Sequence, residues 1–367
     1  MNSPDAVLFI GFGGPEKSDD VMPFLEIVTR GRGIPKERFL NVAHHYELMG
    51  GKSPINAITR QQAAGLEAAL KNVGSPLPVF IGQRNWHPFL ADTLQKMASK
   101  GIKRAIGFPA APHRCEASLE RYINATEEAR RQMGESAPVI EYVGPWFDHP
   151  LFIEAIAERV KETLQSVPVE RQASMKWYFT AHSIPCGMAK GSTYVQELRR
   201  TAQLVCQKLG RKDWALAYSS RSGNPSEPWL EPDVCDLIRS DANKGVSTIF
   251  YIPIGFIADH VEILFDLDVE AKEAAKESGI ALYRSRSVGD HPLFTRMMAE
   301  VVRSRISQPE KPEQRSSIIT RYADGQQESM AGPSTDVCYC HPNTEDPPCA
   351  RWVRASAGRS IHSPKKS

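Results

Sequence analysis

The sequence predicts an α/β protein made of two domains with parallel sheets flanked by helices, followed by a tail. Apolar runs of strand length alternate with amphipathic stretches of helix length, which is typical of parallel α/β architecture. The strand-like runs form two groups of four, which indicates two similar halves that meet across a cleft. From about residue 307 onward this periodicity stops, and Pro, Ser, Gln, Arg and Lys dominate. We therefore predict domains over residues 1–150 and 151–306, and a tail over 307–367 that is disordered unless something binds it.

The expected strands are short apolar runs bounded by turn residues. In the first half they are Ala6–Ile10, Val79–Gly82, Ala105–Phe108 and Val139–Tyr142. In the second half they are Lys176–Thr180, Ala215–Ser219, Thr248–Pro253 and Ala281–Tyr283. Helical periodicity is found between them, near residues 57–72, 88–100, 116–133, 151–166, 193–209, 260–278 and 292–306.

Several of these strands run directly into glycine, proline or polar residues. Ligands of open α/β sheets bind beyond the carboxyl ends of the strands, so these loops are the expected walls of the cleft. The loops are Gly11–Pro15, Pro109–Arg114, Ala181–Pro185, Ser219–Pro228 and Ile254–His260.

The composition is that of an ordinary globular protein, with 41% hydrophobic and 24% charged residues. Because 45 basic residues face 43 acidic ones, the net charge is only +2, and nucleic acid is not an expected partner. No apolar run reaches the roughly 18–20 residues that span a bilayer. The first residues also lack the basic and then apolar pattern of a secretion signal. We therefore expect a cytoplasmic protein, whose seven cysteines do not form a disulfide scaffold.

One histidine stands at the end of a predicted buried strand, in the segment Thr180-Ala181-His182-Ser183-Ile184-Pro185. A neutral imidazole nitrogen is available near physiological pH, so His182 can serve as a base or as a metal ligand. The alternative is a structural, hydrogen-bonded histidine, and that is the better interpretation of any one of the 10 histidines taken alone.

Three acidic residues recur every fourth position after the predicted strand Thr248–Pro253. On a helix, Glu262, Asp266 and Glu270 would form a single acidic ridge. Like charges at this spacing repel, so the ridge destabilises the helix unless a cation offsets it. Carboxylate oxygens suit a divalent metal ion that keeps part of its hydration. A solvated helix face is the alternative, but the apolar residues 263–265 indicate a partly buried element and favour a functional site.

The first predicted strand runs into Gly11-Phe12-Gly13-Gly14-Pro15. Glycines let a flat ligand approach the backbone closely. The segment has neither the Lys-Ser/Thr of a phosphate-binding loop nor the spacing of a dinucleotide site. The triplet Gly51-Lys52-Ser53 resembles the end of a phosphate-binding loop, but the glycine that should precede it is missing, so nucleotide binding is not predicted.

Taken together, five segments resemble the ferrochelatase family, and specifically its bacterial coproporphyrin III branch. They are Phe12-Gly13-Gly14-Pro15, Gly50-Gly51-Lys52-Ser53-Pro54, Thr180-Ala181-His182-Ser183-Ile184-Pro185, Pro228-Trp229-Leu230-Glu231-Pro232-Asp233 and Gly255-Phe256-Ile257-Ala258-Asp259-His260-Val261-Glu262. They occur in the family's order within residues 5–306. The resemblance implies a lyase of haem biosynthesis that inserts Fe²⁺ into a porphyrin. It also implies two Rossmann-like, chelatase-type domains with the porphyrin in the cleft between them.

The resemblance also implies roles for individual residues. His182 and Glu262 match the paired catalytic residues that face the porphyrin centre. With them, Asp266 and Glu270 match metal ligands, the last two in an acidic line that binds or conducts a second metal ion. The matching porphyrin-binding residues are Phe12, Arg30, Tyr46, Ser53, Tyr122 and Trp229.

Two positions depart from the family pattern. Some coproporphyrin enzymes have a tyrosine that ligates the product iron where this chain has Phe12, which offers no donor atom. Axial ligation must then come from elsewhere, with His182 as a candidate, or be absent. The position beside Arg30 that is often a second arginine is Thr29 here, which leaves the propionate contacts less defined.

The tail carries three cysteines within twelve positions, Cys338, Cys340 and Cys349. Thiolates at close spacing favour Zn²⁺ or an iron–sulfur cluster. By resemblance to ferrochelatases with a [2Fe–2S] cluster, the fourth ligand is expected to be Cys115, with Cys186 as the second candidate. A zinc site that includes His341 and a tail with free thiols remain alternatives.

Other functions remain open at this stage. A haem-binding module without catalysis would need a pocket and an axial ligand, but it has no use for the acidic ridge. A cobalt chelatase of the same fold would usually have more histidines at the metal site. A serine hydrolase is disfavoured because the chain lacks the Gly-x-Ser-x-Gly motif. Protoporphyrin IX is the alternative substrate to coproporphyrin III, and an insoluble product implies transient contact with a membrane or a haem-accepting protein.

Overall fold

The first half of the chain forms a parallel sheet of four strands. The computed structural model describes residues 3–31, 36–222 and 227–307, so the cysteines of the tail lie outside it. The sheet has the order β2-β1-β3-β4. Its strands are β1 Ala6–Gly11, β2 Val79–Gln83, β3 Arg104–Pro109 and β4 Val139–Tyr142. Strand β1 is buried along its whole length, as a continuous apolar run in a parallel sheet requires.

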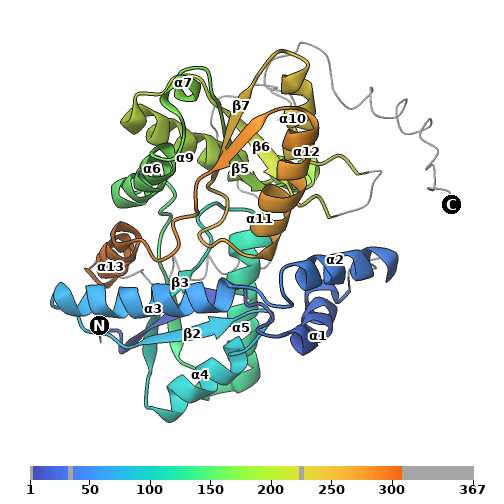
Figure 1. Ribbon diagram of the computed structural model, residues 1–367. Helices are drawn as coiled ribbons and strands as arrows, with labels where there is room; N and C mark the ends of the chain where they lie inside the picture. Colours follow the sequence, from blue (N-terminus) through green and yellow to red (C-terminus); the bar gives the residue numbers. More distant parts are fainter. Residues whose placement is uncertain (1–2, 32–35, 223–226, 308–367) are drawn as a thin grey trace.

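The second half repeats this arrangement (Figure 1). Its strands are β5 Lys176–His182, β6 Ala215–Ser219, β7 Thr248–Pro253 and β8 Ala281–Arg284. They pair in parallel in the order β6-β5-β7-β8, so in each half the first strand lies between the second and the third. The predicted α/β fold with two parallel sheets is therefore confirmed, and each strand begins and ends within two residues of its predicted bounds.

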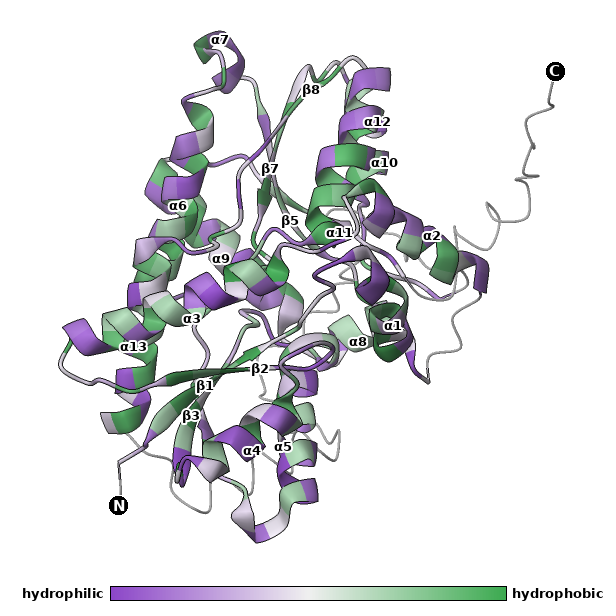
Figure 2. Cartoon of the chain, turned by 60° about the horizontal axis from the view of Figure 1, so that its bottom comes forward, coloured by the Kyte–Doolittle hydropathy of each residue, from purple (hydrophilic) through white to green (hydrophobic). Residues whose placement is uncertain are grey.

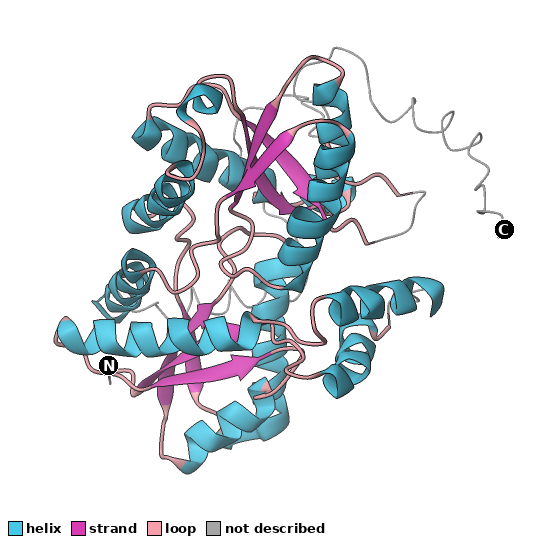
Figure 3. Ribbon diagram, viewed as in Figure 1, coloured by secondary structure: helices cyan, strands magenta, loops and turns pink. Residues whose placement is uncertain are grey.

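Helices flank both sheets, as Figure 3 shows. In the first half they are α1 Ser18–Thr29, α2 Lys36–Leu48, α3 Ile55–Asn72, α4 Leu90–Ser99, the π-helical η1 Glu116–Glu120, α5 Arg121–Met133 and the short η2 Gly134–Ser136. In the second half they are α6 Pro150–Leu164, α7 Val169–Gln172, α8 Cys186–Lys190, α9 Tyr194–Leu209, α10 Val234–Ala242, α11 Val261–Phe265, the π-helical η3 Asp266–Glu270, α12 Ala271–Glu277 and α13 Pro292–Ser307. The seven predicted helical regions are present, whereas α1, α2, α7, α8 and α10 were not predicted.

The two halves share an apolar core. Helix α13 follows the last strand of the second half, yet it packs on α3 of the first half as well as on α6. The ring centroid of its Phe294 lies 5.8 Å from that of Trp146. Trp146 in turn stacks on Phe108 of β3, with ring centroids 5.5 Å apart. In Figure 2 the central strands of both sheets are mostly coloured as hydrophobic. Among the described residues, no helix is both long and apolar enough to cross a membrane, and a cytoplasmic location stays a prediction.

One glycine fixes the approach of two strand ends in the second half. The N–H of Gly255 donates to the carbonyl of Thr180 at 3.2 Å. A Cβ at position 255 would lie 2.7 Å from both Cα and Cβ of Ala181, next to His182. Only a residue without a side chain allows this close approach.

We expect Gly255→Ala to lower the free energy of unfolding by about 1–3 kcal/mol, because the backbone of Ala181 must move to relieve the contact. Urea denaturation measures the change. Gly187→Ala on α8 is the matched control, because a Cβ there meets no atom within 4 Å. Equal effects of the two substitutions would contradict the packing argument.

Candidate active site

His182 is the last residue of β5 and presents one ring nitrogen toward the second half's acidic helix. Its Nδ1 is hydrogen bonded to the carbonyl of Ser183. Because a carbonyl only accepts, Nδ1 carries the proton, and in the neutral ring Nε2 has the free lone pair. The hydroxyl of Tyr194 donates to the backbone carbonyl of His182 at 3.1 Å and fixes the strand end.

Glu262 lies opposite this nitrogen, in the first turn of α11. Its Oε2 is 3.7 Å from Nε2 of His182, and the side chains are 41% and 29% exposed, respectively. His260 caps the helix, since its Nδ1 accepts from the N–H of Glu262 at 3.2 Å. Burial lowers the pKa of His260, which keeps the ring neutral and able to accept this bond. The predicted pair therefore comes together, with both side chains open to solvent.

The acidic ridge continues from α11 into the π-helical turn η3. An α-helix has 3.6 residues per turn, so Asp266 is rotated by roughly 40° about the helix axis from Glu262. The π-helical turn is wider, with i→i+5 hydrogen bonds, so four residues fall short of one turn and Glu270 rotates back toward Glu262. The wide turn thus brings the ridge closer to a straight line than the regular helix that the sequence predicted.

Asp266, in the middle of the ridge, is partly buried. Burial raises its pKa to about 7, and the charges of Glu262 and Glu270 add to this, while a hydrogen bond from the hydroxyl of Ser220 opposes it. Ser220 follows β6 and has a φ of 61°, a left-handed conformation that is uncommon for serine. Burial also raises the pKa of Glu270, together with the charge of Asp233.

Arg284, the last residue of β8, secures this helix at two points. It donates to Asp259 at 3.0 Å, just before the cap, and to Asp268 at 3.1 Å, within the π-helical turn. The arginine side chain is only 10% exposed. Its charge lowers the pKa of Asp268 against the effect of burial. This cation therefore offsets part of the repulsion along the acidic helix.

Two tyrosines of the first half are influenced by the charge of Glu262. Tyr46 of α2 and Tyr122 of α5 are both buried. Burial raises the pKa of each, to about 12 for Tyr122, and the negative charge of Glu262 raises both further. Phe12 packs on Phe24 with ring centroids 6.3 Å apart. The two tyrosines thus lie within electrostatic range of Glu262.

The sequence analysis missed Arg84, which follows β2. Its guanidinium lies 5.8 Å from the ring centre of Phe12, and its charge opposes the increase in the pKa of Tyr122. Arg84 is thus a cation within range of two predicted porphyrin contacts. The available signal was its place directly after a strand, the same criterion that identified the other loops.

Ser53 is buried and helps to fix the glycine loop after β1. Its backbone N–H donates to the carbonyl of Pro15 at 2.8 Å. On the next helix, the Asn56 side chain donates to the carbonyl of Gly14 at 2.8 Å and accepts from its N–H at 3.1 Å. A Cβ on Gly14 would lie 3.0 Å from Cβ of Ser53, so the glycine is needed for this packing.

Two predicted porphyrin contacts are not brought to the pair by any described interaction. Arg30 is exposed at the end of α1. Trp229 is 8% exposed, and its backbone pairs with Pro185, beyond the loop of His182.

Cys115 does not match the environment of a cluster ligand. Its side chain is 1% exposed in the shared core, and burial raises the pKa of the thiol to about 11, whereas a cluster requires a thiolate. Cys186 is also buried. Within residues 3–307, apart from the two undescribed loops, no three His, Cys, Asp or Glu side chains are close enough to hold a metal ion. Cys338, Cys340 and Cys349 lie outside the described residues, so the expected cluster is not supported.

Structural comparison supports the chelatase-type fold. SirB from Bacillus subtilis, in a structure with Fe³⁺, matches with a TM-score of 0.51 at 13% sequence identity, over 83% of this chain and 95% of SirB. A sirohydrochlorin chelatase SirB in complex with cobalt, from Bacillus subtilis subspecies spizizenii, matches with a TM-score of 0.50. At this level of identity the likeness concerns the fold alone.

Sequence comparison gives the family. The Ferrochelatase family model matches residues 4–306. A ferrochelatase of Rhodopirellula baltica is 45% identical over 310 residues, which cover 84% of this chain and 88% of that protein. A coproporphyrin III ferrochelatase of Nocardia farcinica is 41% identical over 82% of this chain and 88% of the relative. The chain therefore belongs to the ferrochelatase family, whose members are lyases that insert a metal ion into a porphyrin.

Proposed function

We propose that the chain inserts Fe²⁺ into coproporphyrin III, with His182 and Glu262 at the reacting centre. The observation that carries the proposal is the 3.7 Å separation of Nε2 and Oε2, with buried tyrosines of the other half within electrostatic range of Glu262. A nitrogen and a carboxylate oxygen at this distance are too far apart for a hydrogen bond, but both can contact one metal ion. A pair that supplies two donors leaves further metal positions for porphyrin nitrogens, as a substrate metal requires.

The chemistry follows from the residue types. A free-base porphyrin loses two pyrrole protons while Fe²⁺ sheds its water. Nε2 of neutral His182 is the base that accepts a proton, and Nδ1 keeps its own through Ser183. Glu262 guides the metal ion and takes the first proton onward, so that Nε2 of His182 is free to accept the second. A porphyrin bent between the two halves would expose its nitrogen lone pairs, a form of substrate distortion.

The acidic ridge offers a path for cations and protons to and from the pair His182 and Glu262. Glu270 is exposed, Asp266 is partly buried, and Oε2 of Glu262 lies 3.7 Å from Nε2 of His182. With a pKa of about 7, Asp266 changes protonation readily at neutral pH. We propose that Asp266 and Glu270 deliver the cation or carry released protons outward.

We favour coproporphyrin III over protoporphyrin IX as the substrate. It carries twice as many propionates, which the polar side chains named below could bind. The relatives from Nocardia farcinica and Mycolicibacterium smegmatis are named coproporphyrin III ferrochelatases, at 41% and 40% identity. Arg84 and Ser53 in the first half are candidate propionate partners, with Arg30 further along α1. Haem transfer to another protein or a membrane stays a prediction. Exposed Met22 and Leu40 on the helices α1 and α2 would suit such a contact.

The proposal is tested by anaerobic Fe²⁺ insertion, followed by visible absorbance, with coproporphyrin III and protoporphyrin IX side by side. We expect the wild type to turn over coproporphyrin III faster, and His182→Ala and Glu262→Gln to lower kcat by about 10²-fold or more. His44→Ala, at an exposed position of α2, is the control and should keep activity. Tight porphyrin binding without insertion would favour the non-catalytic binding protein, and faster turnover of protoporphyrin IX would reverse the substrate assignment.

We expect Arg84→Leu to raise KM for coproporphyrin III by about tenfold, with kcat within about twofold, because a charged hydrogen bond to a propionate is typically worth 1.5–3 kcal/mol. Steady-state kinetics measure both constants. Arg131→Leu, on the exposed face of α5, is the matched control. An unchanged KM would remove Arg84 from the porphyrin site.

The raised pKa of Asp266 should make the free energy of unfolding depend on pH. Its pKa is about 7 in the folded protein against an ordinary value of 3.8, so the folded state binds more protons between these values. The stability it contributes is present below about pH 4 and is lost as pH rises through 7. Asp266→Asn should therefore gain stability relative to wild type between pH 4 and 8, by about 1–4 kcal/mol, in urea denaturation. Asp236→Asn at an exposed site should show no such trend, and a flat difference for Asp266→Asn would contradict the assignment.

A further inference from the structure

Gln62 joins the two halves at the loop that precedes the catalytic carboxylate. It lies on α3 in the first half and is 1% exposed. Its Nε2 donates to two backbone carbonyls of the second half, to Ile257 at 3.1 Å and to Gly289 at 2.9 Å. We propose that Gln62 is a positioning residue for metal insertion, which sets the place of Glu262 relative to the porphyrin wall of the first half.

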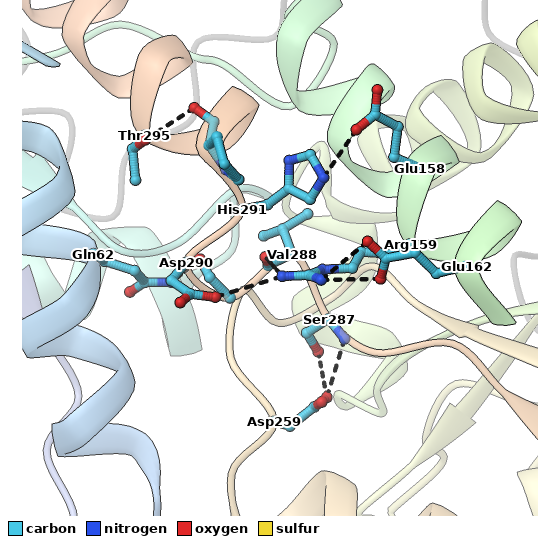
Figure 4. A network of polar contacts seen from close by, with 12 residues as sticks. Gln62, Glu158, Arg159, Glu162, Asp259, Ser287, Val288, Asp290, His291 and Thr295 are labelled. Atoms are coloured by element: carbon cyan, nitrogen blue, oxygen red, sulfur yellow. Dashed lines mark hydrogen bonds and ion pairs between the residues drawn. The ribbon is translucent and has the colours of Figure 1, made fainter.

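The two carbonyls belong to segments that are themselves bonded together. The N–H of Gly289 donates to the carbonyl of Ile257 at 2.9 Å. The N–H and hydroxyl of Ser287 donate to one carboxylate oxygen of Asp259, at 3.1 and 2.8 Å (Figure 4). The loop 257–259 leads directly into the cap His260 and then Glu262. Gln62 therefore holds both segments at the base of the acidic helix.

The segment 285–291 is fixed in turn to the second half by α6. Arg159 donates to the carbonyl of Val288 at 3.3 Å and pairs with Glu162 at 3.0 Å (Figure 4). His291 lies 3.1 Å from Glu158. Because these contacts all lie within the second half, they cannot set its position relative to the first half. The bonds of Gln62 run between the halves and can do so.

The helix that carries Gln62 also holds the glycine loop of the first half. Asn56, Thr59 and Gln62 recur every third position and are all buried, although their side chains are polar. Asn56 bonds the backbone of Gly14, as described above, and the Thr59 methyl lies 3.6 Å from where a Cβ of Gly11 would be. One rigid helix thus contacts the loop of Phe12 at one end of this row and the loop of Glu262 at the other. A functional site placed in this way depends on its supporting residues for its geometry.

The amide of Gln62 has no equivalent replacement at this site. Methionine has a similar length and volume but donates no hydrogen bond, so it would leave the carbonyl of Gly289 without this donor while preserving packing. The loop 257–262 would then be held less tightly, and the separation of His182 and Glu262 would vary. A small displacement of a reacting group lowers the rate of the chemical step more than it lowers the affinity for the substrate.

The test compares Gln62→Met with Gln172→Met in the full chain. Gln172 is the matched control because its Nε2 also donates to two carbonyls, of Leu164 and Val167 at 3.1 and 2.9 Å, but within the second half alone. We expect Gln62→Met to lower kcat for Fe²⁺ insertion by about tenfold or more, to leave KM for the porphyrin within about threefold, and to shift the pH dependence of kcat. Gln172→Met should lose thermal stability only.

Hydrogen exchange of the backbone amides in residues 257–265 gives a readout apart from activity. Exchange there should be faster in Gln62→Met and unchanged in Gln172→Met. Wild-type kcat and pH dependence in Gln62→Met, with the same loss of thermal stability as in Gln172→Met, would overturn the inference and leave Gln62 a structural residue. Should Gln62→Met not fold, Ser287→Ala removes one bond of the same network, and it should lower kcat in the same direction.

The inference rests on the proposed function, but the two can fail separately. If the wild type does not insert Fe²⁺ into either porphyrin, the proposed function fails, while the hydrogen exchange still reports whether Gln62 holds the loop. If the wild type is active and the exchange of residues 257–265 is unchanged in Gln62→Met, the inference alone fails.

Discussion

The close approach of Nε2 of His182 and Oε2 of Glu262 is the interaction on which the rest of the site depends. His182 ends β5 and Glu262 lies on the helix that follows β7, and these two neighbouring strands pair in parallel in the second sheet. The carbonyl of Thr180 accepts from the N–H groups of both Ile254 and Gly255, at 3.0 and 3.2 Å, so the strand ends are held together past the sheet. Parallel pairing brings both carboxyl ends to one edge, and Gly255 allows their close approach. The distance between base and carboxylate is thus a consequence of sheet geometry.

The acidic helix is unfavourable by itself and is stabilised by residues outside it. Three carboxylates in a row repel one another, and burial of Asp266 disfavours its charged form. The hydroxyl of Ser220 partly satisfies Asp266, but it does so from a left-handed backbone conformation. Arg284 supplies the opposite charge at Asp259 and Asp268 and leaves the ridge itself without a fixed cation among the contacts described. Strain and unbalanced charge of this kind concentrate at functional sites and are held by the surrounding structure.

The sheets could be predicted from the sequence because buried parallel strands are continuous apolar runs between turn residues. Helix α1 contains Pro23, which obscures its periodicity, and α10 begins at Val234, directly after the cap Asp233. His182 could be predicted as a site residue because it ends a buried strand, and Glu262 because acidic residues recur every fourth position after β7. Their pairing is implied by the family resemblance. The π-helical turn and the role of Gln62 could not, because a bond between positions 195 residues apart depends on how the two halves pack. The local sequence pattern therefore predicts most of the strands and helices, whereas the geometry of the site depends on contacts between distant parts of the chain.

The two halves have different tasks in this arrangement. The second half carries the pair His182 and Glu262, the proposed reacting centre, and the acidic helix on one network of hydrogen bonds, which suits a centre whose geometry must not vary. The first half contributes α2, which contacts that helix mainly through apolar surface. Tyr46 and Val261 belong to one buried cluster, and His45 stacks on Phe265 with ring centroids 3.6 Å apart. Apolar contacts are non-directional, so the flat faces of a macrocycle can replace them with little loss, whereas the bonds of Gln62 cannot be exchanged in this way. A porphyrin bound between the halves, as proposed, would therefore compete with the apolar contacts of α2, while Gln62 of α3 would keep its two bonds to the second half.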